Sequence, residues 1–216
     1  MRTTREPCEN ERLRRVEGSL VNYSAELILR SIAFVIALHC TSSALAQSQP
    51  DAAKREGEAL YMDIHRVLTH PRCLNCHPNG DSPKQGTNRQ IHLPPITRGL
   101  RDHGPAGIQC AACHQTKNYP VAGVPGAPGW HLAPRSQAWE DKTPGEICRS
   151  IKNRRTNGNK SLAEIVKHLT EDELVAWGWA PGKDNAGNER EPVPIAKPEF
   201  NRIVHAWAKM GAVCPQ

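Results

Sequence analysis

Two copies of the pentapeptide Cys-x-x-Cys-His constrain the fold and function of this chain more than any other feature. They occupy residues 73–77 and 110–114. Two thiols three positions apart can each add to one of the two vinyl groups of a haem, and the adjoining histidine can bind the iron. The pattern therefore predicts two covalently bound c-type haems. The attachment residues would be Cys73, Cys76, Cys110 and Cys113.

The same motifs predict the first ligand of each iron. His77 and His114 directly follow the second cysteine of their pairs, so we expect both to be proximal ligands. A four-cysteine zinc site is an alternative, but the two pairs lie farther apart than a compact zinc ribbon needs. A redox dithiol is another, but neither pair lies within a βαβ pattern.

An export signal precedes both motifs. Residues 32–38 are apolar and follow Arg30, and small residues then lead to Ala46, as in a signal peptide with an A-x-A cleavage site. The apolar run is too short to span a bilayer, although a retained anchor is the alternative. We therefore expect residues 1–46 to be an N-terminal extension with a cleaved signal peptide. Residues 47–216 would then be a periplasmic di-haem cytochrome c domain without a membrane span.

The charge of the chain does not indicate a nucleic-acid partner. The formal net charge is +6, and the four propionates of two haems would offset most of it. The mature part also lacks a cluster of Lys or Arg residues interleaved with aromatics. Nucleic acid is therefore not an expected partner.

Apolar residues recur at helical spacing near both ends of the mature chain. They predict a helix over residues 52–68 and another over residues 198–210, which Gly211 would stop. Residues 78–109 and 118–136 are rich in Gly and Pro without a sustained period, which predicts irregular loops.

Three capping boxes predict helix starts ahead of the last helix, each pairing Ser or Thr with a Glu three positions later. The pairs are Thr143 with Glu146, Ser161 with Glu164, and Thr170 with Glu173. No pattern predicts a sheet of any size. The expected fold is a single, mainly α domain with extensive irregular loops and little or no sheet.

Cys148 and Cys214 are the cysteines of the mature chain that lie outside the two motifs. An even pair in an oxidising compartment predicts a disulfide. The alternative makes one of them a thiolate ligand to iron, which would need its partner to be free.

The distal iron ligands must come from Met or His. Met62 and Met210 lie in predicted helices, where packing is the usual role of Met. We predict His92 and His131, which lie in irregular segments beside prolines, with His70 in reserve. The remaining histidines are assigned to helix surfaces or a turn. They are His65, His168, His205 and His103.

Four segments of the mature chain have a recognisable combination of sequences. They are residues 70–78 (HPRCLNCHP), 130–134 (WHLAP), 177–179 (WGW) and 211–215 (GAVCP). The combination resembles a group of small exported bacterial di-haem cytochromes, some of whose members are labelled as a subunit of isoquinoline 1-oxidoreductase. The resemblance implies an electron acceptor for a periplasmic, molybdenum-containing dehydrogenase. Cys148 and Cys214 match the spare cysteines of that group.

The sequence therefore predicts a periplasmic electron carrier rather than an enzyme. Bis-histidine ligation at both haems would leave no open iron site and would give low potentials. The alternative is a small haem enzyme, a peroxidase or a sulfur-compound dehydrogenase, with one open haem. A haem-based sensor would need a signalling segment, and the sequence offers none.

Overall fold

A helix at residues 51–68 opens the part of the chain that the structure, a computed structural model, describes: residues 51–216. The predicted helix over residues 52–68 is thus confirmed. Its buried side chains recur at helical spacing and include Tyr61, Ile64 and Val67. The predicted signal peptide lies outside the described residues.

Two of the predicted capping boxes start helices. Helix α3 (Pro144–Lys152) begins after Thr143, and helix α4 (Leu162–Glu171) begins after Ser161. In each case the hydroxyl accepts a backbone N–H from the first turn, and the Glu carboxylate of that turn accepts the N–H of the capping residue. The two predictions are confirmed.

The third predicted box, Thr170 with Glu173, is wrong. Thr170 lies inside α4, where its buried hydroxyl donates to the Val166 carbonyl at 2.8 Å. Helix α5 (Glu173–Ala176) is instead capped by Asp172, which accepts the first N–H groups of that helix. Asp is a stronger N-cap than Thr, and the position of Thr170 inside α4 gives its hydroxyl a carbonyl partner. A 3-10 turn, η3 (Trp177–Trp179), follows α5.

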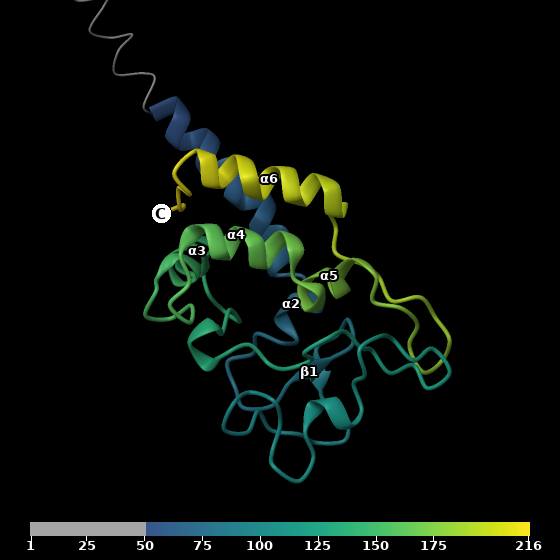
Figure 1. Ribbon diagram of the computed structural model, residues 1–216. Coiled ribbons are helices and arrows are strands. Elements are labelled where there is room, and N and C mark those ends of the chain that lie inside the picture. The colour runs from purple at the N-terminus through teal and green to yellow at the C-terminus, as the bar shows by residue number, and fades with distance from the viewer. Residues whose placement is uncertain (1–50) are drawn as a thin grey trace, which may run out of the picture. The chain divides into compact units, whose positions relative to one another are not determined.

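Helix α6 (Lys197–Lys209) matches the predicted last helix to within one residue at each end. Gly211 follows it with a φ of 84°, a conformation that Gly adopts without strain. Figure 1 shows α6 alongside α4, with the helix at residues 51–68 crossing behind them. The rings of Tyr61 and Trp207, 5.6 Å apart, join this first helix to α6.

The hydrophobic core lies among these helices. Its fully buried members include Tyr61, Ile64, Ile147, Phe200 and Trp207. A disulfide joins Cys148 of α3 to Cys214, whose Cα atoms are 5.6 Å apart. The predicted pairing is therefore seen, and neither sulfur is a free thiolate for iron.

Short elements connect long loops in the lower part of Figure 1. They are α2 (Pro71–Leu74), the antiparallel strands β1 (Lys84–Gln85) and β2 (Gln90–Ile91), and the 3-10 turns η1 (Cys110–Ala112) and η2 (Arg135–Gln137). Within residues 51–216 this strand pair is the whole sheet, and the described part is mostly helical, as expected.

A buried arginine organises the loops. Arg98 Nη1 donates to the Asp102 carboxylate at 2.6 Å and to the Ala133 carbonyl at 2.7 Å. Its Nη2 donates to the Gly80 carbonyl at 3.0 Å. One guanidinium therefore holds three loop segments together where few apolar side chains are available.

In the region from residue 51 onwards, the structure contains no helix whose length and apolar character would suit it to crossing a bilayer.

Candidate functional site

The first motif begins within the short helix α2. Cys73 lies in the helix, and Cys76 and His77 follow Asn75, the residue that ends it. His70 is the N-cap of α2, and its Nδ1 accepts the backbone N–H of Arg72 at 3.3 Å. The position of His70 as reserve distal ligand stays a prediction, but the structure gives its ring a capping role.

His77 is held by two contacts that together orient its ring. Its Nδ1 lies 2.7 Å from the backbone carbonyl of Gln137, and its ring stacks on Trp139 with centroids 3.4 Å apart. A carbonyl oxygen only accepts, so Nδ1 must carry the proton and the lone pair is left on Nε2. Burial lowers the pKa of His77 to about 3, so the ring stays neutral and can bind a metal.

His114 repeats this arrangement at the second motif. Its Nδ1 lies 2.7 Å from the Pro125 carbonyl, and its ring stacks on Trp130 with centroids 4.6 Å apart and planes inclined by 9°. Burial is again the main cause that lowers its pKa. Both motif histidines therefore present a free Nε2, which is the orientation that a neighbouring hydrogen bond gives to metal-bound histidines.

His92 lies opposite His114. The two ring centroids are 5.8 Å apart, and His92 Nδ1 is 2.9 Å from the Pro94 carbonyl, which leaves its Nε2 free as well. Two metal–imidazole bonds of about 2 Å each would place ring centroids roughly 6 Å apart. The structure thus brings His92, one of the two predicted distal candidates, to a spacing from His114 that would fit a shared iron; the sequence did not say which motif it would serve.

A cavity of about 200 Å³ adjoins the first motif. Cys73, Cys76 and His77 line it on the motif side. Apolar side chains cover much of the rest, as a porphyrin face requires. They include Leu68, Ile151, Ile165, Leu169, Leu174 and Val175. Among the described residues, the donor set and this apolar lining fit a haem attached at the first motif.

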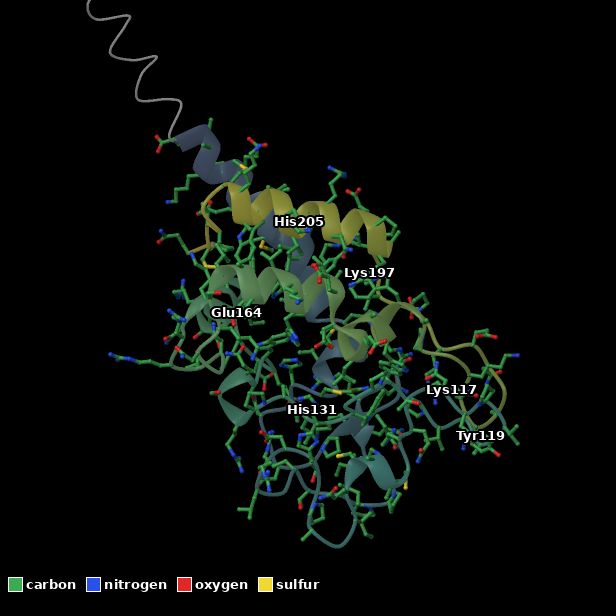
Figure 2. The ribbon with its side chains drawn as sticks, in the orientation of Figure 1. Lys117, Tyr119, His131, Glu164, Lys197 and His205 are labelled. Carbon is green, nitrogen blue, oxygen red and sulfur yellow. A yellow bond between two sulfur atoms is a disulfide. The ribbon has the colours of Figure 1, made fainter. Side chains whose placement is uncertain are left out.

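His131, the other predicted distal candidate, also lines this cavity, and its role as a ligand stays a prediction. Its Nδ1 bonds to the Gly129 carbonyl, and its ring stacks on His103 with centroids 4.8 Å apart. Figure 2 places His131 in the middle of the molecule, where the helices meet the loops. Asp102, which directly precedes His103, has a φ of 63°, in agreement with the predicted turn at His103.

The side chain of His168 is 42% exposed, in line with its predicted place on a helix surface. The sequence did not predict that His168 also lines the same cavity as His77. Its Nδ1 lies 3.3 Å from the Asp172 carboxylate. The helical pattern located the face of α4 that packs on the core, but α4 has a second apolar neighbour in the cavity. An acidic residue four positions after a helical histidine was the available signal.

The other histidines and methionines differ in exposure. His205 on α6 is exposed, as predicted (Figure 2). His65 is half-buried instead of surface-exposed, and burial lowers its pKa. Met62 is 41% exposed, and neither Met62 nor Met210 is among the residues that line the cavity.

Burial disfavours the thiolate forms of Cys73, Cys76 and Cys110. Burial raises the pKa of Cys73 to about 12. Burial, and to a smaller extent the charge of nearby Cys110, raises the pKa of Cys76 to about 11. A dithiol oxidoreductase needs the opposite shift, because the thiolate is its nucleophile.

Within residues 51–216 no group of three or more His, Cys, Asp or Glu side chains is arranged to hold a bare metal ion. Compared with known proteins, the chain matches no family model, no curated protein and no solved structure.

Proposed function

We propose that this chain is a periplasmic electron carrier with two covalently bound haem c groups, attached at residues 73–77 and 110–114. The observation that carries the proposal is the shared setting of His77 and His114. Each has Nδ1 on a backbone carbonyl, a tryptophan against its ring and a free Nε2. When bound, each haem supplies a one-electron iron couple.

Further histidines beside both motif histidines support electron transfer rather than substrate chemistry. His92 faces His114, and His131 lines the cavity beside His77. An iron with two protein ligands has no position left for a substrate. The enzyme alternative requires one of these distal positions to be open, and no observation favours it.

The closeness of the two motifs supports a single di-haem domain over residues 47–216. Trp130 stacks on His114 and also lines the cavity beside His77, so one side chain belongs to both sites. Two redox groups held this close can exchange electrons within one molecule. The expected partners are periplasmic redox proteins. The resemblance to di-haem cytochromes favours a molybdenum-containing dehydrogenase as the electron donor.

The test is production of the full chain in a bacterium that has the c-type haem maturation machinery. We expect the mass of the secreted protein to exceed that of the polypeptide by two haems. The double variant Cys110→Ser/Cys113→Ser should carry one, and Cys148→Ser/Cys214→Ser is the matched control that should keep both. A secreted protein with the mass of bare polypeptide would overturn the proposal.

Spectra recorded during a redox titration extend the test to function. We expect two low-spin haems in both oxidation states, with reduction at low potentials. The reduced protein should not bind carbon monoxide. Rapid binding at one haem would support the enzyme alternative and exclude a carrier with two closed sites.

A further inference from the structure

His168 and Asp172 form a pair that the sequence did not predict. His168 lies in the last turn of α4, and its Nδ1 is 3.3 Å from Asp172 Oδ2. The other carboxylate oxygen, Oδ1, accepts the N–H groups of Leu174 at 2.9 Å and Val175 at 3.1 Å. The start of α5 therefore fixes the carboxylate, and the carboxylate in turn orients the imidazole.

The pair lies on the wall of the cavity beside the first motif. His168 and Asp172 line the same space as Cys73, Cys76 and His77. With Nδ1 towards the carboxylate, Nε2 is the nitrogen left for a ligand bond. A carboxylate hydrogen-bonded to a metal-binding histidine fixes its tautomer and raises its basicity.

His131 is held differently. Its Nδ1 partner is Gly129, two residues away in the same loop, and its ring rests on the exposed His103. His168 instead belongs to a helix that packs on α6 in the core. A ligand on a rigid element needs less ordering when it binds.

We propose that His168, oriented by Asp172, is the distal ligand of the iron bound by His77, in place of the sequence-based candidate His131. The inference rests on the proposed function, since it needs a haem at the first motif. It makes Asp172 a positioning residue, because this carboxylate acts through the imidazole of His168.

Exchange of the ligand for methionine gives the clearest test, performed on the mature holoprotein. His168→Met should introduce the far-red absorption band of a Met–Fe(III) bond and raise the potential of one haem. His131→Met is the matched control and should leave the spectrum unchanged. The inference would be overturned if the Met–Fe(III) band appeared in His131→Met. It would also be overturned if a folded His168→Met protein with two haems lacked this band.

A second variant tests the role of the carboxylate without removing the ligand. Asn caps helices as well as Asp does, so Asp172→Asn should preserve α5. It should raise the potential of one haem, because a less basic imidazole stabilises Fe(III) less, and leave the haem content unchanged. Potentials equal to those of the wild type would count against Asp172 as a positioning residue and against the inference.

Haem content separates the two proposals. A wild-type protein without covalent haem defeats the proposed function and this inference with it. A protein with two haems, in which His168→Met and Asp172→Asn both behave like the wild type, defeats the inference alone.

Discussion

The imidazole of His114 lies parallel to the indole of Trp130, with planes inclined by 9° and centroids 4.6 Å apart. Trp130 in turn packs edge-to-face with Trp177, with ring centroids 5.0 Å apart and planes at 84°. His77 is held against Trp139 in the same way. Each motif histidine is therefore fixed by a tryptophan and a carbonyl, which restrict rotation about both χ angles.

Replacement of Trp130 should loosen the second site. Trp130→Leu removes the stack on His114 and the contact with Trp177, and an aromatic pair is worth about 0.5–1.5 kcal/mol beyond its buried area. We expect the free energy of unfolding to fall by about 1–3 kcal/mol and the electron paramagnetic resonance signal of one haem to broaden. Trp130→Phe, which keeps an aromatic face, should show a smaller change. Equal effects from Leu and Phe would argue against stacking as the cause.

Removal of His92 should leave the iron of the second haem without a distal ligand. Its ring lies 5.8 Å from that of His114, so His92→Ala should leave the second haem five-coordinate and able to bind carbon monoxide when reduced. The exposed helical His205 offers a control, and His205→Ala should bind none. The assignment of His92 would be wrong if the alanine variant, loaded with two haems, also bound no carbon monoxide.

The disulfide should stabilise the helical core without affecting the haems. It closes a loop across a sequence separation of 66 residues, for which the chain-entropy model gives roughly 4 kcal/mol. Denaturant titration of Cys148→Ser/Cys214→Ser should show a loss of that order while the haem spectrum stays the same. A change in the spectrum would mean that the core and the iron sites are coupled, contrary to this expectation.

Sequence reasoning succeeded where the determining interactions are local. The boxes at Thr143 and Ser161 involve atoms within one turn, and Gly211 ends α6 through its own backbone. The pairing of Cys148 with Cys214 followed from counting the cysteines outside the motifs. The prediction at Thr170 failed because Asp172, which is a stronger N-cap than Thr, lies two residues later and caps α5 instead.

The sequence could not show contacts between distant loops. Trp139 and Trp130 follow their histidines at different separations, so no common spacing indicated that both stack on a ring. In the sequence Arg98 resembles an ordinary surface arginine, because its acceptors on Gly80 and Ala133 are distant along the chain. The cavity beside His168 was not predicted because helical periodicity identifies one apolar face, whereas α4 packs on the core on one side and borders the cavity on another.

Acid should weaken α3 and α4 through their capping boxes. Hydrogen bonds from the backbone N–H groups of Thr143 and Ser161 hold the pKa values of Glu146 and Glu164 below the ordinary 4.5. A carboxyl group with a lowered pKa in the folded state stabilises the fold above its unfolded pKa. This contribution should decline as the pH falls through 4.5 and disappear below the lowered pKa values. Glu146→Gln/Glu164→Gln retains both boxes without charge and should flatten the stability profile in that window. The check is to measure denaturant midpoints at successive pH values for the wild type and the double Gln variant. A parallel decline in the two proteins would mean that other groups are responsible.

Arg98 should be the most sensitive position in the loops. Its side chain is 7% exposed, and its guanidinium serves Asp102 and the carbonyls of Ala133 and Gly80. Arg98→Met fills similar space but leaves these acceptors without their donor, at a cost of about 2–4 kcal/mol.

Because the lost contacts lie in loops beside both motifs, proteolysis should begin there, within residues 78–136, before the helical core is cut. Mass spectrometry of the first fragments would locate the cleavage. The exposed Arg101 provides the matched control, and Arg101→Met should digest like the wild type. First cuts within α4 or α6 would show instead that Arg98 stabilises the molecule as a whole.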